Sequence, residues 1–578
     1  MTRQRHFHLG LCATALCVAA LLAACAGRPA APHAPLAAAR PGTLQSCTDL
    51  AARAALPGTV YTSATEVPAG TVTVGGVAMA APAHCLVQGR MNERTSPVDN
   101  QRYAVGFEMR LPVAWNGRFF YQANGGLDGV VLPALGGIGG GGPRSSALQM
   151  GFAVISSDAG HAGSMGPRFG LDPQARLDYG YNAVAQLTPM AKNLIAKAYG
   201  RGPDRSYFGG CSNGGRHAMV AAVRSAQQYD GILAGDPGFN LPKAAVAQLY
   251  GAQQYAAVAS AKTPAGQPDL QSAFTPAEMK LVADKVLQRC DALDGLADGI
   301  VSNVQACKTR FDIQTAVPTC VAGTRDGQCL SAPQKNALAN VFVKGARNSA
   351  GQPIYSSFPF DAGVSGSNWR EWKFASPPTR DAGAVAFIFS TPPLADRPQG
   401  LPFALSFDMD RDAPRISAAD GVFRESSLSF MTPPDAANLG ALRDKGGRMI
   451  VYHGTSDPVF SSDDTAAWYE RVQAANGGDA SSFARYFPVP GMNHCAGGPA
   501  TDQFDMLGAL VDWVEQGKAP ASVTAAARGP GTPVPNAEIP ANWSPQRTRP
   551  LCPYPQVATY TGGDTERASS FACKPPAP

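Results

Sequence analysis

The pentapeptide Gly-Cys-Ser-Asn-Gly at 210–214 constrains the fold of this 578-residue chain more than any other feature. It follows an apolar run at 206–209 and precedes a helix-like run at 215–226. A serine between such runs occupies a tight, strained turn that only glycine neighbours can flank without steric clashes. We therefore predict a strand, a sharp turn and a helix, with the Ser212 hydroxyl projecting at the end of a sheet.

Other parts of the chain alternate between strand-like and helix-like runs. Strands are predicted at 103–111, 118–121, 151–158, 449–452 and 483–489, with a helix at 183–199. Such alternation indicates an α/β fold with a mostly parallel sheet.

A region rich in Pro and Gly with short helical runs interrupts this pattern. Because chemical motifs lie on both sides of it, we predict one core domain, formed by 47–238 and 438–578, with a large insertion at 239–437.

The first residues are typical of an export signal, because Arg3 and Arg5 precede an apolar run at 9–24. Leu-Ala-Ala-Cys, ending at Cys25, resembles a bacterial lipoprotein site at which the cysteine receives lipid. A plain secretory peptide with an incidental cysteine is the alternative. We predict a signal peptide at 1–25, an Ala- and Pro-rich tether at 26–46, and a periplasmic, outer-membrane or extracellular protein.

Charge and cysteine content narrow the class of protein further. The net charge of +5 is small for this length, and the absence of a dense Lys/Arg run argues against nucleic acid as a partner. A membrane partner is expected only through an N-terminal lipid. Ten of the thirteen cysteines follow Cys25, an even number that suits five disulfides in an oxidising compartment. The spacing leaves their connectivity open.

A serine hydroxyl is a weak nucleophile unless a base takes its proton. The α/β-hydrolase order is serine, acid, histidine, and this order selects Asp457 and His494, each in a loop after a predicted strand. Asp463 and Asp464 are the rival acids, and we predict that they cap a helix near Thr465.

Two cysteines flank the candidate residues. Cys211 precedes the serine and Cys495 follows His494, so a bond between them would hold nucleophile and base together. Two buried free thiols are the alternative. We expect His217 to be structural and His453 to be a polar loop residue near the site.

The motifs at 210–215, 454–457 and 491–495 together resemble those of the tannase and feruloyl esterase family. The similarity runs from about Cys47 to the C-terminus, and within the family it is greatest to the mono(2-hydroxyethyl) terephthalate hydrolase branch. The resemblance implies an α/β-hydrolase core whose insertion forms a lid.

The resemblance also implies an oxyanion hole made by the backbone N–H groups of Gly126 and Asn213. The five disulfides that it implies are Cys47–Cys85, Cys211–Cys495, Cys290–Cys307, Cys320–Cys329 and Cys552–Cys573.

The segment 291–300 carries three aspartates and glycines, which can surround a hard cation with oxygen ligands. On spacing alone a solvated acidic turn is the alternative. The resemblance implies a structural Ca²⁺ held by the Asp291, Asp294 and Asp298 side chains and the Leu296 and Ile300 carbonyls. No organic cofactor is expected.

Enzymes of the terephthalate branch hold a substrate carboxylate with a lid arginine that is followed by a Phe-Ser pair. Here the stretch near Arg380 is shorter, and a surface arginine paired with Asp381 is the alternative. The candidate substrate contacts are Gly125, Arg380, Phe389, Ser390 and Phe460.

These residues predict a serine esterase that cleaves esters of aromatic carboxylic acids through an acyl-enzyme. The expected binding partner is a small aromatic ester substrate, and a monomer is the favoured oligomeric state. A tannase or feruloyl esterase acting on plant phenolic esters is the first alternative. A catalytically silent lipoprotein that binds aromatic esters and an acyltransferase are the others.

Overall fold

The computed structural model describes residues 35–74, 77–138, 146–321 and 324–576. The chain from Pro35 onward forms one compact unit. The predicted signal peptide with Cys25 and most of the tether lie outside the described residues. Within them, no helix is long and apolar enough to cross a membrane.

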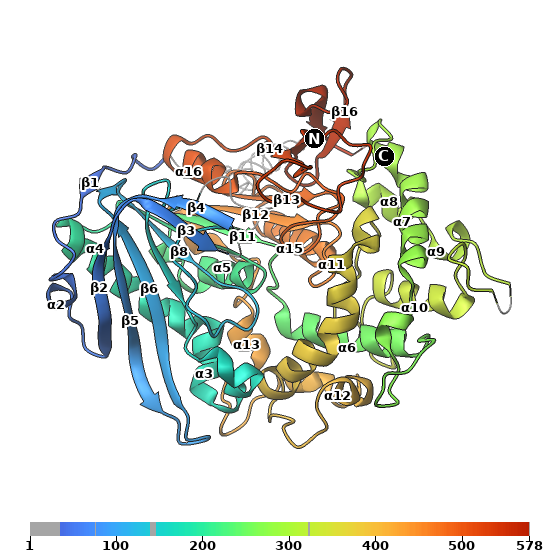
Figure 1. Cartoon of the computed structure of the whole chain (residues 1–578), viewed down its shortest axis with the longest axis horizontal. Helices are drawn as coiled ribbons and strands as arrows, with labels where there is room; N and C mark the ends of the chain where they lie inside the picture. The colour runs from blue at the N-terminus through green and yellow to red at the C-terminus, as the bar shows by residue number, and fades with distance from the viewer. Residues whose placement is uncertain (1–34, 75–76, 139–145, 322–323, 577–578) are drawn as a thin grey trace, which may run out of the picture. The chain divides into compact units, whose positions relative to one another are not determined.

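A nine-stranded mixed sheet forms the centre of the fold (Figure 1). In spatial order its strands are β13 (Ala484–Val489), β12 (Arg448–Gly454), β11 (Gly231–Gly235), β10 (Arg205–Cys211), β8 (Arg118–Gln122), β9 (Ala153–Ser157), β6 (Arg102–Pro112), β5 (His84–Thr95) and β2 (Thr59–Val67). The strands from β13 to β9 are mutually parallel, whereas β6, β5 and β2 each run antiparallel to their neighbours. The chain is therefore a mixed α/β protein, as its sequence predicts.

Three strands of this sheet are not recognised from the sequence pattern. β11 has five buried residues, two of them glycine, so it shows no alternation of apolar and polar positions. β2 and β5 pair with each other along an antiparallel edge. Both carry many polar residues, because one of their faces is exposed.

Successive residues of the parallel strands pack alternately into two separate hydrophobic cores. Phe208 and Ile232 pack with one hydrophobic cluster, whereas their neighbours Tyr207 and Leu233 pack with the other. The first cluster includes residues of α4 (Ala183–Tyr199), α5 (Asn213–Arg224) and α15 (Ser462–Ala475), and the second includes residues of α16 (Met506–Gln516). Because successive side chains of a strand point to opposite faces, helices cover both faces of the sheet.

Between β11 and β12 the described chain adds no strand to the central sheet. Its α-helices are α6 (Leu241–Ala256), α7 (Pro276–Cys290), α8 (Val304–Arg310), α9 (Ile313–Ala316), α10 (Ala332–Phe342), α11 (Ser367–Arg370), α12 (Leu401–Ser406), α13 (Ser427–Met431) and α14 (Gly440–Asp444). In Figure 1 this segment runs from green through yellow to orange. Its treatment as a domain of its own stays a prediction.

Small two-stranded sheets complete the described fold. They pair β1 (Gly42–Thr43) with β7 (Ala114–Trp115), β3 (Gly70–Val74) with β4 (Val77–Ala81), β14 (Val523–Ala526) with β15 (Thr548–Leu551), and β16 (Val557–Tyr560) with β17 (Phe571–Lys574).

Ten cysteines form five disulfides. The bonds join Cys47 to Cys85, Cys211 to Cys495, Cys290 to Cys307, Cys320 to Cys329, and Cys552 to Cys573. These are the pairs that the family resemblance implies. The bond from Cys211 to Cys495 spans 284 residues and ties the end of β10 to the loop after β13.

We predict that this long-range bond contributes more to stability than the bond between Cys320 and Cys329, which spans nine residues. Closing a longer loop removes more conformational entropy from the unfolded chain. On this entropic account the two disulfides differ by about 3 kcal/mol in their contribution to the free energy of unfolding. Chemical unfolding of Cys211→Ser/Cys495→Ser and of Cys320→Ser/Cys329→Ser, each against the parent protein, measures both losses. Equal losses would contradict the prediction.

Candidate active site

Ser212 lies in a strained turn between β10 and α5. Its backbone has φ 66° and ψ −126°, a conformation that residues with a side chain seldom adopt. A Cβ on Gly210 or on Gly214 would come within 2.5 Å of the Ala123 carbonyl oxygen, so both positions require glycine. Ser212 immediately precedes α5, and the N-terminus of that helix favours negative charge there.

The structure brings the three predicted residues into hydrogen-bonding contact. His494 Nε2 lies 2.8 Å from Ser212 Oγ, and His494 Nδ1 lies 2.7 Å from Asp457 Oδ2. Burial acts to raise the pKa of Asp457, but His494 and His453 hold that pKa well below its ordinary value. Asp457 is therefore a carboxylate that accepts from Nδ1–H and leaves Nε2 free to accept the serine proton.

Two further buried groups lie beside this set. His453 Nε2 lies 3.2 Å from Asp457 Oδ2, so His453 is at the site as expected, although it lies in β12 and not in a loop. Asp236 directly follows β11 and accepts hydrogen bonds from the N–H groups of Gly454, at 3.0 Å, and Cys495. Burial raises the pKa of Asp236 to about 6. Its place at the carboxyl end of a parallel strand is the signal that could have identified it.

The rival acids do not contact His494. Asp464 accepts from Asn240 Nδ2 at 2.8 Å, and Asp463 accepts from Ser357 Oγ at 2.7 Å. The prediction that these two cap the helix is wrong. Ser461 is the cap of α15, because its hydroxyl oxygen accepts from the Asp463 N–H, and both aspartates lie in the first turn.

Gly126 and Asn213 line the same cavity as Ser212. Gly126 has φ 64°, which glycine adopts without strain. Among the described residues, the structure gives neither backbone N–H a hydrogen-bond acceptor. A Cβ on Gly125 would lie 3.8 Å from Ser212 Cβ, so Gly125 lies beside the serine although it does not line the cavity.

Aromatic side chains surround His494 and the cavity. The Phe460 ring lies 5.4 Å from the imidazole, edge to face, and the Trp372 ring lies 5.0 Å away in the same geometry. Trp372 comes from the segment between β11 and β12 and is not identified from the sequence. Phe389 also lines the cavity. Ser390 does not line it, and the Ser390 carbonyl instead accepts a hydrogen bond from buried Arg176.

Arg380 lines the cavity and also has a partner within the protein. Its guanidinium lies 3.9 Å above the Trp372 ring and hydrogen-bonds Ser376. Its Nε lies 3.7 Å from Asp381 Oδ1, and burial raises the pKa of that carboxyl. Arg380 therefore lines the cavity and is paired with Asp381, and its role in holding a substrate carboxylate stays a prediction.

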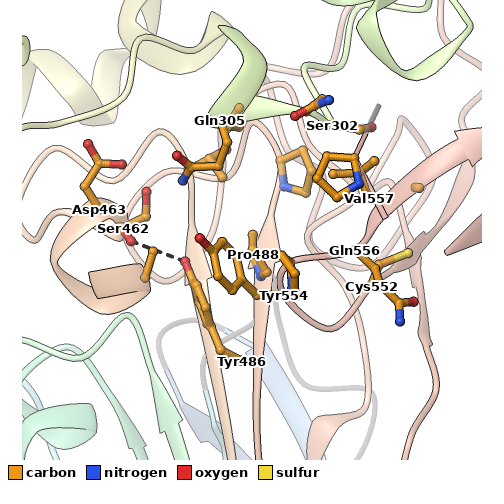
Figure 2. Close-up of a pocket in the computed structure, with 18 of the residues that line it drawn as sticks. Ser302, Gln305, Ser462, Asp463, Tyr486, Pro488, Cys552, Tyr554, Gln556 and Val557 are labelled. Atoms are coloured by element: carbon orange, nitrogen blue, oxygen red, sulfur yellow. Dashed lines mark hydrogen bonds between the residues drawn. The ribbon is translucent and has the colours of Figure 1, made fainter. Parts of the chain in front are cut away.

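Figure 2 shows a larger cavity beside β13 and α15, with Tyr486, Tyr554 and Pro488 among its walls. The cavity at Ser212 is the smaller of the two. The two cavities share no lining residue, and Ser212 lines only the smaller one. The smaller cavity is therefore the candidate active site.

The acidic segment at 291–300 forms a tight loop. Asp291 accepts from the N–H groups of Asp298 and Gly299, at 3.0 Å and 2.9 Å, and Asp298 is also paired with Arg549. Burial, together with the charges of Asp298 and Asp291, raises the pKa of Asp294 to about 7. A buried carboxyl group among other carboxyl groups gains from a bound cation. The carboxylate oxygens of Asp291, Asp294 and Asp298 do not all lie within 4.8 Å of one another, so the Ca²⁺ site stays a prediction.

Comparisons with known proteins identify the class. Residues 85–574 match the family described as tannase and feruloyl esterase. Feruloyl esterase B from Aspergillus oryzae has the same fold, with a TM-score of 0.72 at 24% identity over 91% of this chain and 99% of that one. The chain therefore belongs to the tannase and feruloyl esterase family of carboxylic ester hydrolases.

Within that family, the similarity to individual relatives extends over most of the chain. A mono(2-hydroxyethyl) terephthalate hydrolase of Piscinibacter sakaiensis is 42% identical over 533 residues, or 86% of each protein. An uncharacterized esterase of Xanthomonas campestris is 32% identical over 569 residues, or 91% of each. The chain is thus similar over its length to an enzyme named for a terephthalate mono-ester.

Lys373 follows Trp372 and is buried, with Nζ 3.9 Å from the centre of the Phe358 ring. Burial lowers the pKa of Lys373 to about 7, against the opposing effect of Asp457 and Asp381. Because the unfolded chain keeps its proton up to a pKa of about 10.4, the charged lysine destabilises the fold most below pH 7. This penalty falls as the pH rises above 7.

We predict that Lys373→Met stabilises the protein by about 2–3 kcal/mol more at pH 6 than at pH 9. Unfolding free energies of both proteins at the two pH values measure the effect. Lys344→Met, at an exposed lysine, serves as the control and should show no such dependence. A pH-independent effect of Lys373→Met would contradict the prediction.

Proposed function

We propose that this protein hydrolyses esters of aromatic carboxylic acids through an acyl-enzyme on Ser212. The observation that carries this proposal is the continuous hydrogen-bonded set of Ser212, His494 and Asp457 beside an aromatic-walled cavity. A pure binding protein has no need of this set, which argues against a silent aromatic-ester-binding lipoprotein. An acyltransferase would differ only in which acceptor replaces water.

The geometry supports a two-step reaction. His494 Nε2 takes the Ser212 proton as Oγ attacks the ester carbonyl, while Asp457 holds the Nδ1–H tautomer. The N–H groups of Gly126 and Asn213 donate to the tetrahedral oxyanion. His494 then protonates the leaving alcohol, and water, activated by the same imidazole, releases the acid from Ser212.

The substrate that we propose is mono(2-hydroxyethyl) terephthalate, cleaved to terephthalate and ethylene glycol. The similarity to the Piscinibacter sakaiensis enzyme supports it, as do the rings of Trp372, Phe389 and Phe460 and the cation of Arg380 at one cavity. Plant phenolic esters are the alternative, since a feruloyl esterase C of Talaromyces stipitatus is 26% identical over 81% of the chain. The ion pair of Arg380 with Asp381 also favours that alternative.

We further propose that 239–437 is a lid on an α/β-hydrolase core, because three residues of this segment, Trp372, Arg380 and Phe389, line the cavity at Ser212. Five disulfides support export to an oxidising compartment. A lipid on Cys25 would anchor the protein to a membrane.

The loop at 291–300 is proposed to hold a structural Ca²⁺. The side chains of Asp291, Asp294 and Asp298 and the carbonyls of Leu296 and Ile300 would be its ligands. Bound there, the ion would neutralise three neighbouring carboxyl groups and rigidify the loop. It would take no part in the reaction.

We predict that Ser212→Ala and His494→Ala each lower kcat by about 10⁴-fold or more, because either change removes proton transfer to or from the nucleophile. Hydrolysis of a terephthalate mono-ester, measured by chromatography of the released acid, checks this. Ser225→Ala, at the other end of α5, should keep kcat. Wild-type turnover by Ser212→Ala would rule out the mechanism.

We predict that Arg380→Ala lowers kcat/KM for mono(2-hydroxyethyl) terephthalate by about 10- to 100-fold, because an ion pair with the substrate carboxylate is lost. The uncharged bis-ester should change less than about threefold, and so should Arg347→Ala, outside the cavity, on both esters. Methyl ferulate and methyl gallate complete the panel. A preference for either phenolic ester would keep the chemistry and refute the terephthalate assignment.

We predict that chelation with EDTA lowers Tm and that added Ca²⁺ restores it, because the ion binds the folded loop only. Asp294→Asn should lower the Tm and abolish the response to Ca²⁺. Asp284→Asn, on the exposed face of α7, should keep the response. A Tm that is insensitive to EDTA and Ca²⁺ in the parent protein would refute the site.

A further inference from the structure

The loop that carries the proposed oxyanion donor Gly126 is tied to three other elements. Tyr179 Oη donates to the Gly126 carbonyl at 3.2 Å, and His161 Nε2 lies 2.8 Å from the Leu127 carbonyl. Asp128 Oδ2 accepts from Asn213 Nδ2 at 2.8 Å. Each residue of 126–128 therefore has its own polar contact with a separate part of the fold.

Unlike the other two contacts, the contact of Asp128 joins the two segments that carry the proposed oxyanion donors. Asp128 lies on the loop of one oxyanion donor, and Asn213 supplies the other donor from the first turn of α5. Asp128 Oδ2 also lies 2.9 Å from His217 Nε2, one turn further along α5. Among the described residues, every side-chain hydrogen bond between 125–129 and α5 ends on this carboxyl group.

The network around Asp128 is buried and fixed at both ends. The Asp128 side chain is 2% exposed and that of His217 is 4% exposed. The Asn213 amide cannot rotate freely, because its Oδ1 accepts from Arg216 Nε at 2.6 Å while its Nδ2 donates to Asp128. Arg216 in turn donates to the Tyr179 carbonyl at 2.9 Å, which closes the network back to the residue that holds Gly126.

We propose that Asp128 is a positioning residue that sets the separation of the two oxyanion donors. By holding Asn213 and His217, its carboxyl group keeps the Gly126 loop at a fixed distance from the start of α5. This inference rests on the proposed esterase function and goes one step further into the same site. Donors that are preorganised for the oxyanion stabilise the transition state more than the ground state, and a misplacement of about 1 Å is costly to catalysis.

A positioning role predicts a particular kinetic signature. Asp128→Ala should lower kcat by about 10- to 100-fold, less than the 10²- to 10³-fold loss that follows removal of a whole donor. KM should stay within about threefold, because the ground-state carbonyl gains little from these donors. Asp128→Asn should recover most of kcat, because its amide oxygen can accept from both Asn213 and His217.

The test compares kcat, KM, Tm and the inhibition constant of phenylboronic acid, which forms a tetrahedral adduct with a reactive serine. Phenylboronic acid should bind Asp128→Ala more weakly in parallel with the fall in kcat. The matched control is Asp158→Ala, which removes a half-buried carboxyl group whose Oδ1 accepts from the Gly106 and Gly160 N–H groups, both at 2.9 Å. That variant should lose stability but keep kcat and boronate binding.

A second variant keeps the proposal open to refutation if Asp128→Ala does not fold. Asn213→Ala removes the amide contact but retains the backbone N–H donor, so it should also lower kcat with little change in KM. Wild-type kcat and wild-type boronate affinity in Asp128→Ala or in Asn213→Ala would overturn the proposal. Wild-type turnover by Ser212→Ala would instead overturn the esterase mechanism, so the two failures are distinguishable.

Discussion

The disulfide between Cys211 and Cys495 is the constraint on which the candidate site depends. It links the residue before Ser212 to the residue after His494, across 284 positions of the chain. The whole segment between β11 and β12 lies within the loop that this bond closes. Asp236 adds a second restraint at the same place, because it accepts from the Cys495 N–H and from Gly454. The serine and the imidazole are thus held by groups outside the reacting set.

The central sheet explains why residues so distant in sequence can meet. β10, β11, β12 and β13 are parallel neighbours, so their carboxyl ends lie along one edge. Ser212, Asp236 and Asp457 follow three of these strands, and His494 follows the fourth. The segment between β11 and β12 then supplies Trp372 against the imidazole. One rigid edge therefore provides the reacting groups, and a separate segment provides cavity walls.

Much of the fold class and the order of serine, acid and histidine could be predicted from the sequence, because glycine requirements and buried strands leave strong local patterns. Positions 210 and 214 must be glycine, because a Cβ at either would clash with the Ala123 carbonyl oxygen. Asp236 is missed because β11, the strand that it follows, shows no alternating pattern. The roles of His453 and Trp372 could not be assigned, because they depend on contacts between elements far apart in the chain. Ser461 as the cap of α15 shows the same limit, since two aspartates nearby fit the local pattern equally well.

The buried polar groups beneath the cavity distinguish this site from a bare set of three residues. Asp128, His217, Asn213 and Arg216 form one hydrogen-bonded network. His453, Asp457 and His494 form another, and Asp236 beside it accepts from Gly454 and Cys495. Buried polar groups are stable only when their hydrogen bonds are made, so each network restricts the loops that it joins to one arrangement. The candidate site is therefore preorganised before substrate binds.

The most direct test of the central claim is rapid acid quenching of a reaction with excess mono(2-hydroxyethyl) terephthalate, followed by proteolysis and mass spectrometry. Formation of an acyl-enzyme predicts that the peptide containing Ser212 gains the mass of the terephthaloyl group within the first turnover. The Ser212→Ala protein should show no such adduct on any peptide. Steady turnover with unmodified Ser212, or an adduct on another residue, would contradict the assignment of Ser212 as the nucleophile.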